Sequence, residues 1–238
     1  MGNWNRNWND KLGNNFTDNN SVFHKQMMND KNIETEGKYQ ASVSGAYGEF
    51  TIASVLKSLP SQFHLLNDYL IQTKKGSTQL DHIMVCPYGV IVIETKNHKG
   101  MIFGDMQGQV WTQVVIKGGA PNRNTFYSPV RQNDGHIKHL IKTTGLNPKY
   151  VSGVICFTNP EADLSNVSCP CCFTLEGLYQ YFLALTNYPE ILSKDAIYKI
   201  IKRLDETNIN GYLNAEKHIE YVRSIQEKKE ARKRGYRK

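Results

Sequence analysis

The sequence has no apolar run that approaches the ~20 residues of a membrane-spanning helix. Its first residues lack the apolar centre of a secretory signal peptide, and Arg6 stands where a myristoylation signal requires Ser or Thr. These absences argue against a helical membrane protein, an exported protein and a lipid-anchored one. A cytoplasmic protein without a membrane partner is expected.

Cysteine is scarce and odd in number, with five among 238 residues. In a chain without an export signal, this argues against a disulfide framework. Cys169, Cys171 and Cys172 contain one Cys-x-x-Cys spacing, but a structural zinc site needs four ligands and no second closely spaced Cys or His pair follows. The sequence therefore favours small apolar residues on a strand over a zinc site.

Acidic residues are in the minority, since 22 Asp and Glu stand against 29 Lys and Arg, for a net charge of +7. Residues 189–238 sum to +5, whereas residues 1–40 sum to zero and residues 41–188 to +2. A basic segment of this kind is either a contact for nucleic acid, through neutralised phosphates, or a solvated helix end. The balance favours an acidic partner.

The length fits one main domain with appendages. Residues 1–40 hold eight asparagines in the first 20 positions and few branched apolar residues, which predicts a partly disordered arm. The folded domain is expected in residues 41–188. Residues 189–238 are expected to form a helical extension with a basic tail, with helices over Ser193–Asp205 and Asn214–Glu230.

Periodic apolar residues predict the elements of the folded domain. A helix is expected from a cap at Ser44 to Leu59, with apolar residues at helical spacing: Ala46, Phe50, Ala53 and Leu56. Apolar runs predict strands over Phe63–Gln72, Leu80–Cys86, Val90–Lys96 and Tyr150–Phe157. Residues 101–115 predict further strand pairs, broken by Gly104 and Gly108 and with Trp111 packed, and residues 117–122 are predicted to form a loop.

Two helices are predicted in the second half of the domain. Ser128 followed by Pro129 is a typical helix start, and the next residues divide into a buried side (Val130, Ile137, Ile141) and an opposite side (Gln132, His136). A further helix is expected over Thr174–Leu185. The order of helix, strands, helix, strand and helix predicts an α/β or α+β core with a mixed sheet.

Two acids interrupt the central apolar runs, Asp81 in the first and Glu94 at the end of the second. If the runs form a hairpin around Pro87-Tyr88 in which Cys86 pairs with Gly89, Asp81 lies directly opposite Glu94. Opposed carboxylates about 5 Å apart repel each other unless a cation neutralises them, and Mg²⁺ suits carboxylate ligands. A three-residue turn with a bulge would instead place Asp81 opposite Thr95.

Strand alternation places Lys96 on the same face as Glu94. There its ammonium group is either a catalytic cation, which orients a water and offsets charge on a phosphate, or the partner of an acid at the strand end. Glu49 is expected on or beside the apolar stripe of the first helix. No cation stands three or four positions from it, so its carboxylate needs a cationic partner from elsewhere.

Five patches resemble the nuclease-related domain, NERD, of the PD-(D/E)XK nuclease superfamily. They stand in the family's order between about residues 41 and 160: Gly45–Glu49, Gly76–His82, Glu94–Asn97, Gly100–Trp111 and Ser128–Gln132. Leu80 stands where the superfamily's name has proline. The resemblance implies a restriction-endonuclease-like α/β core, in which a central mixed β-sheet flanked by helices binds a divalent metal at its edge.

Carried over position by position, the resemblance implies that Glu49, Asp81 and Glu94 hold Mg²⁺ or Mn²⁺. It makes Lys96 the catalytic lysine, and Gln132 a helix residue that supports the site or contacts nucleic acid. The expected activity is metal-dependent phosphodiester hydrolysis, with DNA as substrate and endonucleolytic cutting as the first expectation. A binding module with the nuclease fold but little or no chemistry is the alternative, and an interaction scaffold is the third.

Three histidines are further polar candidates. His82 lies on the strand face opposite Asp81, which favours a packed or hydrogen-bonded role. His98 follows the acidic strand within reach of a phosphate, and His136 shares a helix face with Gln132. The sequence leaves open whether the chain forms a homo-oligomer.

Overall fold

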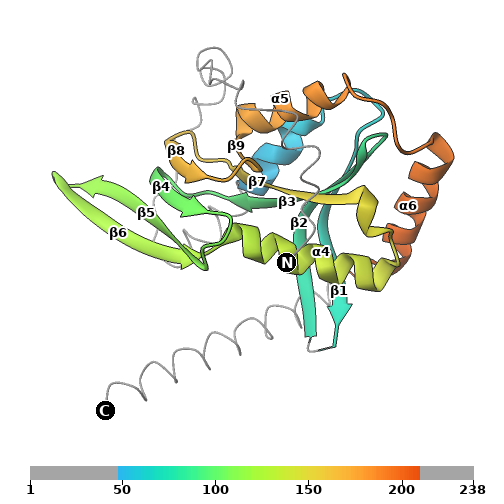
Figure 1. Ribbon diagram of the computed structural model, residues 1–238, viewed down its shortest axis with the longest axis horizontal. Helices are drawn as coiled ribbons and strands as arrows, with labels where there is room; N and C mark the ends of the chain where they lie inside the picture. Colours follow the sequence, from blue (N-terminus) through green and yellow to red (C-terminus); the bar gives the residue numbers. More distant parts are fainter. Residues whose placement is uncertain (1–47, 75, 210–238) are drawn as a thin grey trace.

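Two mixed β-sheets form the centre of the protein, whose computed structural model describes residues 48–74 and 76–209 (Figure 1). The larger sheet has the strand order β1-β2-β3-β7-β9 and the smaller one the order β6-β5-β4-β8. In each sheet the first three strands are antiparallel and the remaining strands join in parallel. The strands are β1 (His64–Thr73), β2 (Gly76–Cys86), β3 (Gly89–Lys96), β4 (Gly100–Asp105), β5 (Val110–Lys117), β6 (Ala120–Tyr127), β7 (Val151–Phe157), β8 (Ala162–Ser168) and β9 (Cys172–Thr174).

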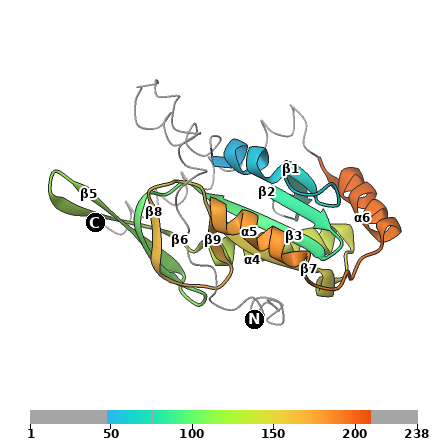
Figure 2. The same ribbon diagram turned by 90° about the horizontal axis from the view of Figure 1, so that it is seen from above.

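Helices cover both faces of the larger sheet (Figure 2). The helix over residues 48–56 and α5 (Leu175–Leu185) pack on one face, and α4 (Pro129–Thr144) and α6 (Lys194–Thr207) on the other. Because side chains alternate along a strand, Met84 and Cys86 face the first pair of helices, and Ile83 and Val85 face the second. This two-sided burial explains why β2 and β3 are nearly continuous apolar runs.

The α4 helix is fixed to the sheet by its caps and by one buried amide. The Ser128 side chain accepts a hydrogen bond from the Arg131 amide, and Gly145 ends the helix with a φ of 71° and donates to the Ile141 carbonyl. Asn133 is fully buried and donates to the carbonyls of Val92 in β3 and Val154 in β7, each at 3.1 Å. The register of α4 against the middle of β3 and β7 is therefore defined by hydrogen bonds as well as by packing.

The smaller sheet differs from the sequence prediction at two places. Residues 120–127 form strand β6, so the predicted loop over residues 117–122 is wrong beyond the turn at Gly118 and Gly119. Gly104 lies inside β4 and does not break it. Strand β6 is almost wholly exposed and belongs to a hairpin that extends from the body (Figure 1). Because neither of its faces is buried, its sequence does not alternate between apolar and polar residues.

The first helix also differs from its predicted pattern. Leu56 of the predicted apolar stripe is buried, but Phe50 is 70% exposed, and Ile52 and Val55 complete the buried side. The difference arises because the sheet takes the helix face that contains the branched residues, which lie about one position away from the predicted stripe. The predicted cap at Ser44 lies outside the described residues.

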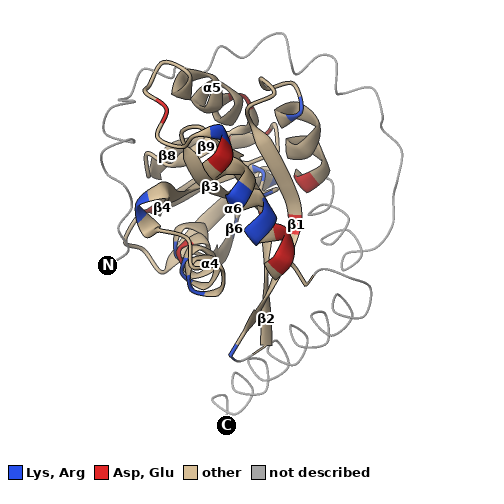
Figure 3. Cartoon of the chain, turned by 90° about the vertical axis from the view of Figure 1, so that its right-hand side faces the viewer, with Lys and Arg blue, Asp and Glu red and all other residues tan. Residues whose placement is uncertain are grey.

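Several predicted elements are confirmed near their expected bounds, namely the strands β1, β2, β3 and β7 and the helices α4, α5 and α6. Helix α6 packs Ile197 and Leu204 on the larger sheet, and its outer side bears charges of both signs (Figure 3), with an ion pair between Lys199 and Asp195 at 2.7 Å. The arm of residues 1–40 and the helix over residues 214–230 lie outside the described residues. No described helix has both the length and the apolarity to cross a membrane.

Substitution Gly104→Ala is expected to destabilise the protein by about 1–3 kcal/mol or more, because the added Cβ would lie 2.1 Å from the ring of Trp111. That ring is fully buried and stacks on Phe157, so it has little room to move. Gly135→Ala is the matched control. It adds a Cβ in open space on α4 and should stabilise by about 0.5–1 kcal/mol. Chemical denaturation measures both, and equal stability of the two variants would contradict the expectation.

Candidate active site

The β2–β3 hairpin has the even register that the sequence argument required. Cys86 pairs with Gly89 and Val85 with Val90, and the regular ladder continues to His82 and Ile93. The next position in this register sets Asp81 opposite Glu94, so the alternative three-residue turn is wrong. Gly89 is needed at the turn, because its φ is 138° and a Cβ there would lie 2.9 Å from the Tyr150 carbonyl oxygen.

Beyond His82 and Ile93, the side chain of Asp81, and not its backbone, forms the next hydrogen bond between β2 and β3. Its Oδ2 accepts a hydrogen bond of 2.8 Å from the amide of Thr95. The carboxylate is thereby held at the end of β3, beside the backbone that links Glu94 to Lys96. The same bond fixes Asp81 independently of any bound ion.

Glu94 is a buried acid that contacts two basic side chains. It is 1% exposed, and its Oε1 forms an ion pair with the Lys96 ammonium. Its Oε2 lies 3.3 Å from His136 Nε2 without regular hydrogen-bond geometry and has no other hydrogen-bond partner among the described residues. His136 is oriented by Thr78, whose hydroxyl lies 3.0 Å from Nδ1. One oxygen of a buried carboxylate is thus left with an unused lone pair.

Lys96 connects the acidic strand to α4. Besides its ion pair with Glu94, it donates to Gln132 Oε1 at 3.2 Å. Gln132 and His136 stand one turn apart, as predicted, so their side chains meet the Glu94 and Lys96 face of β3 together. The predicted opposite side of α4 therefore faces the site, and its polar residues are not simply solvated.

Asp68 is a site residue that the sequence argument missed. In the β1–β2 register, in which Asn67 pairs with His82 and Tyr69 with Leu80, the position of Asp68 falls opposite Asp81. Asp68, Asp81 and Glu94 therefore form one row across three adjacent strands. Asp68 has a φ of 51°, a left-handed conformation that costs a non-glycine residue about 1–3 kcal/mol. The available signal was a polar pair, Asn67-Asp68, inside an otherwise apolar strand.

Glu49 joins this row from the first helix. Its carboxyl is hydrogen-bonded to Asp68, and it is close enough to Glu94 and Lys96 to feel their charges. The helix approaches the sheet closely at Gly48, where a Cβ would lie 2.6 Å from the Thr158 hydroxyl. A larger residue at that position would push the helix, and Glu49 with it, away from the end of β3.

The acids affect one another's ionisation. Burial, followed by the charge of Glu94, raises the pKa of Asp81 well above its usual range. Burial and the neighbouring Asp68 raise the pKa of Glu49 from 4.5 to about 7. Burial also opposes ionisation of Glu94, but the contacts with His136 and Lys96 outweigh it and lower its pKa. Without a bound cation, Glu94 therefore ionises most readily, and the raised pKa values of Asp81 and Glu49 make these two acids retain protons more readily.

Asp81→Asn and Glu49→Gln are expected to stabilise the metal-free protein at pH 8. A raised folded-state pKa contributes stability that is complete below the unfolded pKa, near 4, and is lost as the pH rises through the folded pKa, which is about 7 for Glu49. The neutral amide side chains of the two variants do not ionise, so the variants keep the stability that the wild type loses as the pH rises. Each kcal/mol of stability gained in this way raises the melting temperature by about 2–4 °C.

Thermal unfolding in EDTA at pH 5 and pH 8 measures this effect, with Glu176→Gln on the surface of α5 as the matched control. The stabilisation should shrink toward pH 4, where the wild-type carboxyls are protonated. Glu94→Gln should behave oppositely, because a lowered pKa contributes stability above the unfolded pKa that is lost only as the pH falls. If Asp81→Asn and Glu49→Gln destabilise the protein at pH 8, the charges of the wild-type carboxylates are already compensated, which would contradict this expectation.

The donor set fits a hard divalent cation. Carboxylates of Glu49, Asp81, Glu94 and the missed Asp68 supply oxygen ligands of the kind that Mg²⁺ and Mn²⁺ prefer, and Glu94 Oε2 has a free lone pair. The acids are not drawn into one tight cluster. Among the described residues, only three cysteines of another region bring three potential ligand atoms within 4.8 Å of one another.

Two of the predicted histidines lie apart from this acidic row. His82 is 1% exposed, its Nδ1 lies 2.8 Å from Asn67 Oδ1, and burial lowers its pKa to about 4, so it is a neutral hydrogen-bonded residue near neutral pH. His98 packs its ring on Phe126, with the ring centroids 4.3 Å apart. Only His136 touches one of the predicted site acids.

A comparison with known protein families finds a match over the middle of the chain. Residues 44–158 match the family model of the nuclease-related domain, NERD. This domain belongs to the PD-(D/E)XK-like nucleases, and the match confirms the resemblance seen in the sequence. A Bacillus anthracis protein described as uncharacterized is 34% identical over 105 residues, which are 43% of this chain and 48% of that protein. The chain thus spans about half of that relative. No solved structure matches.

Proposed function

We propose that this chain, whose residues 44–158 match the nuclease-related domain, is a metal-dependent nuclease that hydrolyses phosphodiester bonds in nucleic acid, with DNA as the preferred substrate. The observation that carries the proposal is the row of acids across β1, β2 and β3, with Lys96 two residues beyond Glu94 on the same strand face. Packing of the core alone does not explain why Glu49, Asp68 and Asp81 gather beside the buried Glu94.

The acids are assigned to the metal. Asp81 and Glu94 would hold Mg²⁺ or Mn²⁺, and Glu49 would complete the protein ligands from the helix side. When bound, the ion supplies Lewis-acid polarisation of a phosphate oxygen and lowers the pKa of an attacking water. Asp81 is kept in place for this role by the Thr95 amide, and Glu94 by its burial.

Lys96 and Gln132 are assigned to positioning and charge compensation. In the metal-free protein Lys96 neutralises Glu94, and Gln132 holds the ammonium from α4. If a bound cation compensated the charge of Glu94, the Lys96 ammonium would be free to contact a phosphate oxygen or a water beside it. A cation there offsets the negative charge that develops at phosphorus.

The charge pattern supports a polyanionic substrate. The chain has a net charge of +7, and the β5–β6 hairpin that extends from the body ends in exposed residues that include Lys117. Lys and Arg groups of this kind contact phosphates without reading sequence. We assign the hairpin and the basic residues 223–238 to backbone contacts with the nucleic acid.

The direct test incubates the purified chain with supercoiled plasmid, linear duplex, single-stranded DNA and RNA, each with Mg²⁺, Mn²⁺ or EDTA. Cleavage that requires the metal and nicks the supercoiled plasmid supports an endonuclease acting on DNA. Metal-dependent cleavage of RNA alone would show that the substrate is RNA and not DNA. No cleavage with either metal on any substrate would contradict the proposal.

A non-catalytic binding module is the second candidate. It is favoured by one feature, namely that Lys96 and His136 already compensate Glu94 without an ion and the acids do not form a tight cluster. Nucleic-acid binding that weakens with salt, persists in EDTA and leads to no cleavage would select this candidate.

A further inference from the structure

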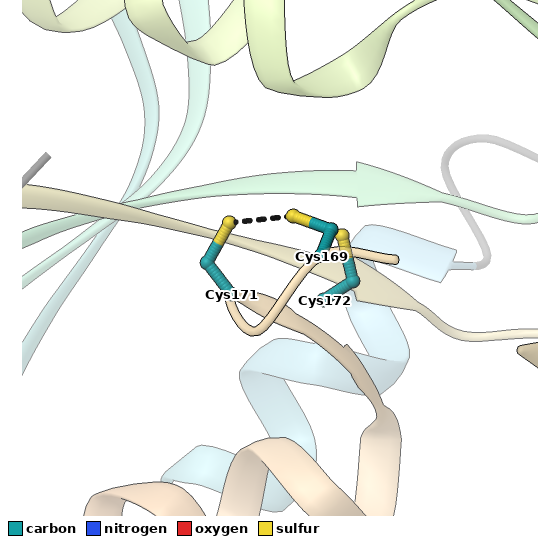
Figure 4. A group of neighbouring side chains, drawn as sticks. All are labelled: Cys169, Cys171 and Cys172. Carbon is teal, nitrogen blue, oxygen red and sulfur yellow. Dashed lines mark hydrogen bonds between the residues drawn. The ribbon is translucent and has the colours of Figure 1, made fainter. Parts of the chain in front are cut away.

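Three cysteine sulfurs lie close together at the junction of the two sheets (Figure 4). Cys169 and Cys171 belong to the turn that follows β8 in the smaller sheet, and Cys172 begins β9 in the larger one. Their sulfur atoms all lie within 4.8 Å of one another, and those of Cys169 and Cys171 are 3.0 Å apart. The sequence interpretation of all three as strand residues is therefore wrong for Cys169 and Cys171.

The backbone around these sulfurs has a defined turn. The Cys172 amide donates to the Cys169 carbonyl at 3.2 Å, which closes a four-residue turn with a Cys-x-x-Cys spacing. The Cys171 amide donates to the Cys169 sulfur, and the Cys171 carbonyl accepts from the Ile155 amide of β7 at 2.8 Å. These bonds fix the turn on the larger sheet, so the sulfurs converge because of the backbone and not through free rotation of exposed side chains.

The surroundings are apolar. Cys169 and Cys171 are buried in a cluster that includes Ile102, Trp111 and Phe157, whereas Cys172 is partly exposed. An apolar shell excludes water from a site and strengthens the attraction between a cation and thiolates.

We propose that Cys169, Cys171 and Cys172 bind one thiophilic metal ion, with Zn²⁺ as the expected ion, and that this ion joins the smaller sheet to the larger one. Tetrahedral zinc with Zn–S bonds of about 2.3 Å needs sulfurs about 3.8 Å apart, whereas the Cys169 and Cys171 sulfurs are 3.0 Å apart and all three sulfurs lie within 4.8 Å of one another. Small rotations of the side chains therefore suffice to form the site.

Three thiolates leave one position for an exchangeable ligand such as water, because no other Cys, His, Asp or Glu of residues 48–74 and 76–209 joins the group. Sulfur ligands select Zn²⁺ or Cu⁺ over Mg²⁺ and Mn²⁺. The site is thus chemically separate from the row of acids.

The test loads the full chain, reduced and stripped with a chelator, with Zn²⁺ or Cu⁺, and measures the metal retained after desalting. We expect one equivalent per chain in the wild type. The single variants Cys169→Ser, Cys171→Ser and Cys172→Ser should lose it, whereas Cys86→Ala and Cys156→Ala, which remove buried cysteines elsewhere, should retain it. Circular dichroism identifies any variant that fails to fold.

A second measurement does not depend on the variants. X-ray absorption of the loaded wild-type protein should show three sulfur neighbours at about 2.3 Å for zinc. Retention of Cu⁺ but not Zn²⁺, with three sulfur neighbours, would support the site and identify copper as its ion. Absence of retained metal, equal retention in the three serine variants, or a shell of nitrogen and oxygen only would overturn the proposal.

Discussion

Asp81→Asn and Glu94→Gln should each reduce DNA cleavage by about 10³-fold or more. Each variant keeps the size of its side chain and removes one of the two carboxylates that lie opposite each other on β2 and β3. The amide oxygen that Asp81→Asn introduces can still accept from the Thr95 amide, so the backbone geometry should persist. Lewis-acid stabilisation by a bound metal contributes several kcal/mol, and each 1.36 kcal/mol corresponds to a factor of ten in rate.

Single-turnover cleavage at saturating Mg²⁺ measures this effect, with Mg²⁺ titrated for each variant. Glu176→Gln, which neutralises an acid on α5 outside the site, should cut like the wild type. Thermal unfolding checks that both site variants remain folded, and Asp81→Asn is expected to be the more stable of the two in EDTA. If the wild type and both variants cleave at the same rate, the acids of the row do not catalyse the reaction.

Lys96→Met should separate metal binding from turnover. Cleavage is expected to fall by about 10²–10³-fold, because the ammonium that offsets charge at phosphorus is lost while the aliphatic volume remains. The affinity for Mg²⁺ or Mn²⁺ should stay the same or increase, because Glu94 is no longer paired with Lys96 and a cation need not displace it. A merely structural lysine would not produce this opposite pair of effects.

Calorimetric titration with Mn²⁺ and single-turnover cleavage together give the two quantities for Lys96→Met. Lys99→Met is the matched control, since Lys99 lies three residues further along, is half exposed, and among the described residues its ammonium pairs only with Glu161, at a long 3.9 Å. A parallel loss of metal affinity and rate would show that Lys96 only orients Glu94. Unchanged cleavage would exclude Lys96 from the reaction.

Much of the site followed from sequence because it depends on local rules. Two apolar runs joined by Pro87-Tyr88-Gly89 define a hairpin, and its two-residue turn is sufficient to set Asp81 opposite Glu94. Alternation along β3 then puts Lys96 beside Glu94. The cap at Ser128 sets the phase of α4, so that Gln132 and His136 share one side.

The exposed hairpin shows where local rules fail. Strand β6 contains few apolar residues because neither of its faces is buried, so its pairing with β5 left no alternating pattern in the sequence. The first helix shows a related failure, since several apolar faces were available and only packing on the sheet selected the one that contains Ile52 and not Phe50.

The sequence by itself determined the hairpin, the order of the elements and the acids on β2 and β3, because turn length, alternation and helix caps act over a few residues. Tertiary structure alone decided that Asp68 joins the acids through pairing of β1 with β2, and that His136 reaches Glu94 across the packing of α4. It also decided that three cysteines converge, because the turn between β8 and β9 is fixed where the two sheets meet. The contact of His136 with Glu94 joins a helix and a strand that are distant in the chain, and its geometry is set by packing that no local pattern encodes.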